Sequence, residues 1–262
     1  MNIVRVLRGR CVRALAVLFL ALGPASCYAP AAGPVRVTQV VDGDTVVLST
    51  GAEVRYIGID APETHRRKAG AWIDVDEPFG AEAGRVNAQL VLDKSVRLEF
   101  DEEQRDTYGR LLGYVWVGQG QSRIMAQEEL LRRGLAFLYT LPPNVKYADR
   151  LKAAQDEARR AGRGLWSRDL SISSREAGEH VGERRLVRGT VEDVLAAPNT
   201  TVLLLEGFRV VIFSRDIGLF LGEGVRPEKD YTGREIRAYG LIKTYRGHPE
   251  MIVSHPGQIE VL

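Results

Sequence analysis

The sequence predicts an α+β protein that contains two small β-barrels in succession. Between residues 35 and 117, strand-like segments of alternating apolar and polar residues are separated by turn residues. Three segments with helical spacing are inserted into or follow these strands. After residue 184, a second group of five strand-like segments has a short helical stretch after its third member. Five such strands with inserted or appended helices are typical of a closed barrel of the oligonucleotide-binding (OB) type.

The first barrel, residues 35–169, is expected to contain five strands and three helices. The expected strands are Val35–Val41, Thr45–Leu48, Val54–Ile59, Val96–Phe100 and Leu111–Val117. The first helix is expected over Gly80–Leu92. We expect Ser122 to cap a second helix that ends at Gly134, and a third helix to run from Val145 to Ala161.

The second barrel is expected over residues 184–262. Its expected strands are Leu186–Val194, Thr201–Leu205, Phe208–Phe213, Glu235–Ile242 and Glu250–Val253. A short helix is expected around residues 215–221. Residues 170–183 belong to a polar stretch with little periodicity, and we interpret them as a linker.

Residues 1–31 have the pattern of an export signal. Four arginines precede the apolar run Ala14–Leu22, whose nine residues are too few for a permanent membrane span. The segment Pro24–Cys27 is similar to a bacterial lipoprotein box, which would end the signal before Cys27 and tether the protein to a membrane through that lipidated residue. Ordinary cleavage near Ala31 is an alternative, and a buried first helix is another. The protein is therefore expected to be periplasmic, a cell-envelope lipoprotein or secreted.

The formal net charge of +2 comes from the same N-terminal segment. Without its first 27 residues the chain has 32 basic and 34 acidic side chains, a net charge of −2. Binding of a polyanion must therefore depend on local sites and not on the overall field. The chain has two cysteines, Cys11 and Cys27, and neither lies in the expected barrels. A disulfide framework and a thiolate metal site are thus excluded there.

Three aspartates fall on or beside one predicted hairpin. Because the hairpin is centred near residues 50 and 51, Asp44 should lie opposite residue 57 or 58, with Asp60 just beyond at the same open end. Calcium prefers six to eight oxygen ligands. Asp44, Asp60 and the backbone carbonyl of Ala61 could provide three of these ligands. Asp42 is near enough to orient these ligands without binding the cation itself. Taken alone, the Asp-Gly-Asp sequence is more typical of a turn.

Two arginines and a glutamate lie close to these aspartates in the sequence or in the expected barrel. Arg55 could face the same pocket, and Arg110 enters it from a later strand. Guanidinium groups bind phosphate oxygens and stabilise charge that develops on phosphorus. Glu63 could accept a proton from an attacking water. Taken singly, each arginine could equally form a surface salt bridge, and a loop glutamate is more often solvated.

Together, these stretches resemble the thermonuclease (staphylococcal nuclease-like) family. The resemblance covers about residues 35–169 and rests on ordered motifs at compatible spacings. They are Val41–Val46, Arg55–Thr64, Tyr108–Arg110, Gly134–Ala136 and Gly164–Ser167. The resemblance implies a calcium-dependent nuclease that hydrolyses phosphodiester bonds of DNA and RNA by metal-assisted attack of water, usually leaving 3′-phosphate ends.

The resemblance also assigns roles to individual residues. It implies that Asp44, Asp60 and the carbonyl of Ala61 bind Ca²⁺. It implies that Glu63 is the general base. It further implies that Arg55 and Arg110 hold the phosphate, while Tyr108 and Tyr139 lie beside the nucleotide.

Two features depart from the family pattern. Ala61 stands where the best-known member has threonine, so the carbonyl ligand is retained but the hydroxyl is lost. The loop over residues 65–79 is longer and more acidic than expected, and could gate the site. Its basic residues Arg66, Arg67 and Lys68 are candidates for contact with the nucleic-acid backbone.

From residue 184 the chain resembles an OB-fold barrel that is attached to some bacterial nucleases. Such barrels stack bases on aromatic side chains and follow the phosphates with basic ones. Lys243, Tyr245 and Arg246 cluster between the last two expected strands and are the candidate contacts. The alternative is a barrel that only braces the nuclease or binds protein, since its basic and acidic residues nearly balance.

Two classes of function remain. The first is an exported, calcium-dependent nuclease that acts on single-stranded or flexible DNA and RNA. The alternative is a catalytically inactive nucleic-acid- or protein-binding module of the same fold. The complete set of active-site residues favours the nuclease. We predict no protein partner and expect a monomer.

Overall fold

The computed structural model describes residues 33–68, 71–74 and 77–262. The predicted export signal, residues 1–31, lies outside this range. The side chains of Arg66, Arg67 and Lys68 also lie outside the described part of the chain. No helix within the described ranges is long and apolar enough to cross a membrane.

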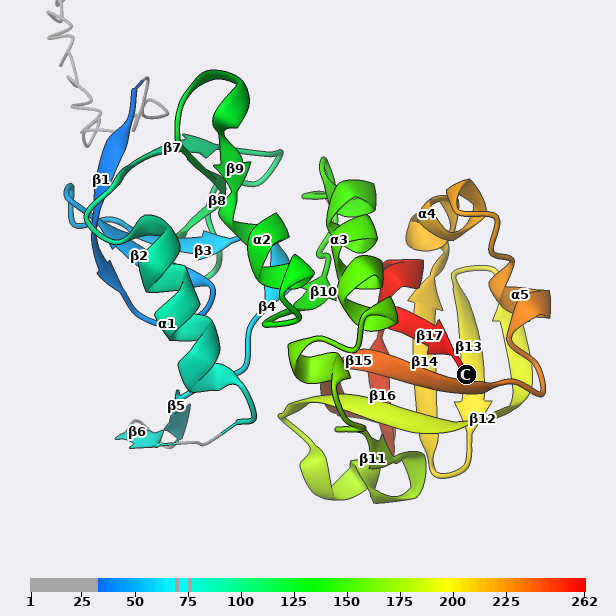
Figure 1. Cartoon of the computed structure of the whole chain (residues 1–262). Coiled ribbons are helices and arrows are strands. Elements are labelled where there is room, and N and C mark those ends of the chain that lie inside the picture. Colours follow the sequence, from blue (N-terminus) through cyan, green and yellow to red (C-terminus); the bar gives the residue numbers. More distant parts are fainter. Residues whose placement is uncertain (1–32, 69–70, 75–76) are drawn as a thin grey trace, which may run out of the picture. The chain divides into compact units, whose positions relative to one another are not determined.

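The first part of the described chain forms a closed five-stranded barrel, drawn in blue to green in Figure 1. Its strands are β1 (Val35–Val40), β2 (Thr45–Leu48), β3 (Glu53–Tyr56), β7 (Ser95–Glu99) and β8 (Leu111–Val117). Antiparallel pairs join β1 to β2 and β7, β2 to β3, and β7 to β8. A parallel pair of β3 with β8 closes the barrel, which confirms the predicted fold.

Three helices and several short strands accompany this barrel. The helices are α1 (Gly80–Val91), α2 (Ala126–Arg132) and α3 (Ala148–Arg160). The short strand β4 (Gly58–Asp60) pairs with β10 (Phe137–Tyr139), and β9 (Ile124–Met125) pairs with β8. The loop after residue 64 contains an unpredicted hairpin of β5 (His65–Lys68) and β6 (Ala71–Asp74).

Two details of the predicted elements are wrong. Ser122 does not cap α2: it belongs to a 3₁₀ turn, η1 (Gly120–Ser122), and Met125 precedes the helix. The predicted strand Val54–Ile59 is divided, because Gly58 takes a φ of 84°, which residues with a side chain rarely adopt. A Cβ at this position would also come within 2.5 Å of Leu151 on α3. The resulting bend turns β4 away from β3.

The predicted alternation in the strands produces the core of the first barrel. Val37, Val46, Val54, Val96 and Val115 are fully buried. Exposed residues flank Val37 on β1 and Val96 on β7, whereas β2 and β8 contain no exposed residue. Burial of such side chains contributes roughly 1.5–3 kcal/mol each. Apolar residues inside the barrel thus stabilise it, and polar groups can occupy its open end.

The later part of the chain forms a second closed barrel, yellow-green to red in Figure 1. Its strands are β12 (Arg184–Ala197), β13 (Thr200–Leu205), β14 (Phe208–Phe213), β15 (Glu235–Tyr245) and β16 (His248–Ile252). The third and fifth strands again pair in parallel, so both barrels have the same strand order. Between β14 and β15 lie η4 (Ser214–Asp216), α4 (Ile217–Gly222) and α5 (Pro227–Asp230). An additional strand, β17 (Ile259–Val261), was not predicted and pairs with β15.

The segment interpreted as a linker is folded. It contains β11 (Ile172–Ser173), which pairs in parallel with β12, and the 3₁₀ helix η3 (Ser174–His180). Ser173 and Glu176 form a capping box at the start of η3. Ala177 is fully buried in the core of the second barrel. The sequence analysis did not predict this structure, because the segment is polar and a single buried alanine does not produce a periodic pattern. The domain boundaries themselves stay a prediction.

Two further 3₁₀ turns, η2 (Gly164–Trp166) and η5 (Pro256–Gln258), lie near the junction of the barrels. The rings of Phe137 on β10 and Tyr239 on β15 stack with centroids 3.9 Å apart. The amide of Gln155 on α3 donates a hydrogen bond of 2.8 Å to the carbonyl of Gly257. Side chains of the second barrel are thus brought against β10 and β4, where the candidate site lies.

Candidate active site

The β2–β3 hairpin positions the first aspartate. Thr45 pairs with Arg55, and the backbone N–H of Tyr56 donates to the carbonyl of Asp44 at 2.9 Å. Asp44 therefore lies opposite residue 56, one or two residues earlier than the predicted 57 or 58, because the connecting turn is tighter than expected. Asp60 reaches the same place only because the chain bends at Gly58. The predicted register is wrong by one or two residues, yet Arg55 bridges the carboxylates of Asp44 and Asp60.

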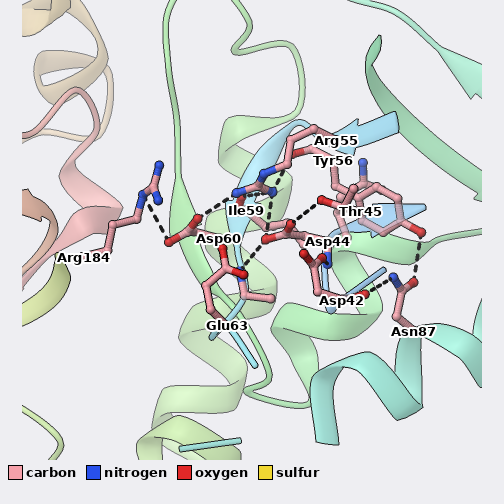
Figure 2. A network of polar contacts seen from close by, with 12 residues as sticks. Asp42, Asp44, Thr45, Arg55, Tyr56, Ile59, Asp60, Glu63, Asn87 and Arg184 are labelled. Carbon is pink, nitrogen blue, oxygen red and sulfur yellow. Dashed lines mark hydrogen bonds and ion pairs between the residues drawn. The ribbon is translucent and has the colours of Figure 1, made fainter. Parts of the chain in front are cut away.

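Arg55 bridges these two carboxylates, as Figure 2 shows. One guanidinium nitrogen lies 2.8 Å from Asp44 Oδ2, and the other lies 2.7 Å from Asp60 Oδ1. It also donates to the carbonyl of Ile59 at 3.0 Å. Burial alone would lower the pKa of Arg55, but Asp44 and Asp60 outweigh it and raise that pKa. The arginine therefore stays charged between the carboxylates.

Asp44 is held on both of its oxygens. Oδ1 accepts a hydrogen bond from the Thr45 hydroxyl at 3.1 Å, and Oδ2 accepts one from the backbone N–H of Ala61 at 2.7 Å. Burial raises the pKa of Asp44 well above its ordinary value, against the opposing effect of Arg55. Asp42 and Asp60 raise it further. Burial and the neighbouring carboxylates therefore favour the protonated form of Asp44 more strongly than Arg55 opposes it.

Asp42 supports Asp44 from the preceding turn. Its Oδ1 accepts from the backbone N–H of Asp44 at 2.9 Å, while its carbonyl accepts from Asn87 Nδ2 at 3.0 Å. The oxygen of the same amide accepts from the Tyr56 hydroxyl at 2.9 Å. A buried asparagine on α1 thus links the turn to the hairpin. This link has no signal in the local sequence.

Glu63 lies in the loop that follows β4 and is half-buried. Its backbone N–H donates to Glu77 Oε2 at 2.9 Å. Burial raises the pKa of the Glu63 carboxyl to about 7, and Asp42 and Asp60 add to this rise. A carboxyl group whose pKa lies near neutrality is suited to exchange a proton with a reacting group.

Arg110 is positioned by an aspartate that the sequence analysis did not single out. Asp106 Oδ2 lies 2.7 Å from Arg110 Nε, and Asp106 Oδ1 accepts from the backbone N–H groups of Tyr108 and Arg110. Gly109 has a φ of 86° in this turn. The aspartate follows the pattern of turns in which a side chain bonds the backbone two residues on. The role of Asp106 in positioning Arg110 could therefore have been predicted from the sequence.

A pocket of about 330 Å³ brings the predicted arginines and aromatic residues together. Its lining includes Arg55, Tyr108, Arg110, Tyr139, Leu141 and Arg184. Tyr108 is 85% exposed, so its ring is open to a ligand. This volume is within the range of small-molecule sites, roughly 300–1,000 Å³.

The candidate residues of the second barrel lie elsewhere. Lys243 and Tyr245 are on β15, and Arg246 occupies the turn to β16 with a φ of 49°. None of the three is among the described residues that line the pocket. The prediction placed these residues between the last two strands of the chain. They lie between β15 and β16, but a further strand, β17, follows this hairpin. Whether these side chains contact nucleic acid stays a prediction.

Two groups from the second barrel reach the site and were missed by the sequence analysis. The Tyr239 hydroxyl donates a hydrogen bond of 2.6 Å to Asp60 Oδ2. Arg184 Nε lies 3.5 Å from the same oxygen, and its guanidinium carbon lies 5.2 Å from the centre of the Tyr139 ring. Figure 2 shows Arg184 approaching Asp60 from the second barrel.

The donor set fits a hard divalent cation in charge and chemistry. Four carboxylates, those of Asp42, Asp44, Asp60 and Glu63, face the guanidiniums of Arg55 and Arg184. Among the described residues, no three acidic, histidine or cysteine side chains converge as a metal cluster. A cation here would therefore need backbone and water oxygens besides the two aspartates, as calcium commonly does. Each carboxylate oxygen has two lone-pair sites, so accepting from the protein leaves capacity for a cation.

Comparisons with known proteins agree with this geometry. Residues 53–168 match a family model described as "Staphylococcal nuclease homologue". The chain is 35% identical to the thermonuclease of Staphylococcus hyicus over 135 residues, which are 50% of this chain and 75% of that protein. It is 38% identical over 146 residues to the endonucleases YncB and YokF of Bacillus subtilis (strain 168). That match covers 54% of this chain, 65% of YncB and 46% of YokF, which is described as SPbeta prophage-derived.

The fold, the site and these relatives define a nuclease, a hydrolase that acts on phosphodiester bonds. The chain belongs to the staphylococcal nuclease family. The predicted family, barrel fold and enzyme class are thereby confirmed. The matched residues of the family model end before the second barrel begins.

Proposed function

We propose that the protein is a calcium-dependent nuclease that hydrolyses phosphodiester bonds of DNA and RNA by attack of water. The observation that carries this proposal is the buried network in which Arg55 joins Asp44 and Asp60. Glu63 and Arg110 lie beside this network and its pocket. Two aspartates, a proton acceptor and two guanidiniums are the groups that such a hydrolysis requires.

In the proposed reaction, an oxygen–phosphorus bond forms from water and the bond from phosphorus to the 5′ oxygen breaks. Glu63 takes the proton of the attacking water, and the 5′ oxygen leaves with a proton from solvent, so the product ends in a 3′-phosphate. Arg55 and Arg110 stabilise the negative charge on the phosphoryl oxygens. Calcium, held by Asp44, Asp60 and the carbonyl of Ala61, would supply Lewis-acid stabilisation of that charge.

Single-stranded or flexible nucleic acid is the proposed substrate. The pocket holds Tyr108 and Tyr139 next to the arginines, and an unstacked base can pack on such rings. This contact does not depend on the identity of the base, which supports action on both DNA and RNA. A base inside a duplex is already stacked and would have to be released first.

We also propose that the nuclease acts outside the cytoplasm, either free or tethered through a lipidated Cys27. Support comes from the arginine-rich, apolar sequence of residues 1–31. The intact mass of the protein isolated from cell envelopes would distinguish a lipid-modified N-terminal cysteine from ordinary cleavage. A full-length chain that keeps its first residues would contradict the proposal.

The roles of individual residues can be tested with single substitutions. Glu63→Ala and Arg110→Ala should each reduce kcat on single-stranded DNA with calcium by about 10²–10⁴-fold, because each removes a group needed in the transition state. Initial rates of cleavage, with the thermal unfolding of each variant, provide the measurement.

Arg36→Ala is the matched control. Arg36 lies on β1, is exposed, and pairs only weakly on the surface with Asp93 at 2.9 Å. Its kcat should stay close to that of the wild type. Folded Glu63→Ala and Arg110→Ala variants with unchanged rates would contradict the proposed site.

A further inference from the structure

Two side chains of the second barrel share one face of its sheet. In the β12–β15 pair, Leu186 lies opposite Tyr239. Arg184 precedes Leu186 by two residues on β12, so the strand alternation places all three on the same face. Leu186 and Tyr239 pack with Phe137 and Leu165 from the nuclease half. The face therefore forms the contact with the nuclease, and Arg184 lies at its edge.

Tyr239 fixes this face against the active site. Its side chain is buried, stacks on Phe137 with an interplanar angle of 18°, and donates its hydroxyl hydrogen to Asp60 Oδ2. Its carbonyl accepts from the amide of Gln258 at 3.2 Å. The position of Tyr239 is therefore fixed at its backbone, on its ring face and at its hydroxyl group. Arg184 pairs with Leu241, two residues after Tyr239 on β15, so it lies next to this fixed position.

Arg184 has donor capacity that the protein does not use. Its Nε is buried and makes no hydrogen bond, although Asp60 Oδ2 lies 3.5 Å away. That oxygen already accepts from Tyr239, and the other oxygen of Asp60 is taken by Arg55. The side chain of Arg184 is still 38% exposed, toward the pocket that it lines. A guanidinium has five N–H donors, and Arg184 lines the same pocket as Arg55 and Arg110, so donors that the protein does not use can reach a ligand there.

The surroundings of Arg184 favour a phosphate over another partner. Its guanidinium carbon lies 5.2 Å from the centre of the Tyr139 ring, which lines the same pocket and is the ring that we propose stacks on a base. A phosphate next to a stacked base is therefore within reach of its donors. Guanidinium groups bind phosphate oxygens in pairs and with charge assistance.

We propose that the second barrel completes the nuclease pocket, with Arg184 binding a phosphate of the substrate strand beside Tyr139. This inference rests on the proposed function, because it assumes that the pocket takes nucleic acid. The phosphate that Arg184 holds is a neighbour of the one that is cleaved, since Arg55 and Arg110 already line the reacting position. Arg184 is thus a substrate-binding residue that a nuclease domain without this second barrel would lack.

The test compares Arg184→Gln with Arg184→Lys in the full chain. Binding of a short single-stranded DNA oligonucleotide is measured by fluorescence anisotropy with a chelator present, over a series of salt concentrations. Arg184→Gln should raise Kd roughly tenfold, because it removes a charge-assisted phosphate contact. It should also reduce the slope of log K against log salt by about 0.7. Arg184→Lys should keep the slope and recover part of the affinity.

Arg188→Gln is the matched control on the same strand. Arg188 pairs with Asp169 and Glu235 at 3.0 and 2.9 Å, and it lies outside this pocket. Its Kd and salt slope should equal those of the wild type. Thermal unfolding of each variant separates lost binding from lost structure. If Arg184→Gln does not fold, a salt slope for folded Arg184→Lys that differs from the wild-type slope overturns the proposal.

Steady-state cleavage separates this inference from the proposed function. With calcium, Arg184→Gln should raise KM and leave kcat within about twofold, as expected when an interaction is equally strong in ground and transition states. If the wild type cleaves DNA and Arg184→Gln has the same KM and kcat, the role of Arg184 is overturned but the proposed function is not. If the wild type binds the oligonucleotide through Arg184 but does not cleave it, the proposed function is overturned and the binding role of Arg184 is not. A wild-type protein that neither binds nor cleaves overturns both.

Discussion

Glu63 carries an energetic cost in the folded protein. Burial and the neighbouring Asp42 and Asp60 raise its pKa from 4.5 to about 7. Between these two values the folded protein keeps the proton and the unfolded chain loses it, so stability falls as pH rises through this window. Above about pH 7 both states are ionised and the cost is fully present. The ionised carboxylate of Glu63 can accept a proton. In the absence of metal, the same negative charge destabilises the folded protein.

Glu63→Gln should therefore stabilise the protein in the absence of metal at about pH 8. We expect a gain of about 1–3 kcal/mol in the free energy of unfolding, because each pKa unit corresponds to about 1.4 kcal/mol. Near pH 4 the gain should vanish, since both states then hold the proton. Urea unfolding with a chelator at the two pH values provides the measurement.

Glu53→Gln serves as the control for that comparison. Glu53 is an exposed glutamate on β3, so its substitution should change stability by no more than about 0.5 kcal/mol at either pH. A Glu63→Gln variant that is less stable than the wild type at about pH 8 would show that the carboxylate is not strained there.

Residues of the site differ in how well the sequence predicts them. Asp44, Arg55, Asp60 and Glu63 fall within one hairpin and its following loop, so their spacing places them near one another, although the bend at Gly58 that brings Asp60 to Asp44 was not predicted. Tyr239 lies 179 residues after Asp60, and no local pattern connects two positions so far apart. Long-range contacts depend on how whole elements pack, which single-sequence patterns do not encode.

At the scale of elements, α1 and the loop after β4 meet at Gly43. A Cβ at this position would lie 2.5 Å from the Cβ of Ala61 and 2.8 Å from that of Ala83. The glycine therefore permits the turn with Asp42 and Asp44 to sit directly against both elements. The close approach holds the Ala61 backbone within hydrogen-bonding distance of Asp44.

Gly43→Ala should disrupt this arrangement. Because the added methyl group overlaps two others, we expect a loss of about 1–3 kcal/mol in the free energy of unfolding and reduced cleavage. Gly84→Ala is the contrast, since Gly84 lies within α1 and a Cβ there meets only ordinary contacts at 3.9 Å. It should stabilise the helix by roughly 0.5–1 kcal/mol. Urea unfolding of both variants measures the effect, and equal stability of the two would refute the packing argument.

Elements with strong alternation are predicted well, and short ones are not. The five strands of each barrel lie close to the predicted ranges, because apolar residues recur at every second position. The three-residue strand β17 and the bend at Gly58 were missed. A three-residue strand has too few positions to show a period, and a bend depends on one residue.

At the scale of the whole molecule, the chain repeats one barrel topology in two roles. The first barrel carries the carboxylates and both predicted arginines, and the residues of the family match end before the second barrel. Yet Tyr239 and Arg184 of the second barrel contact Asp60. The candidate active site therefore includes residues of both barrels, which a family match to the first barrel alone does not reveal.

The most direct test of the central claim is digestion of single-stranded DNA by the intact protein, with millimolar-scale calcium and with excess chelator. Four carboxylates gather around Arg55 and Arg184, and a divalent cation bound there would offset part of their negative charge. We predict cleavage with calcium, none with chelator, and recovery when calcium is restored. Equal cleavage in both conditions, or none by folded protein in either, would contradict the account.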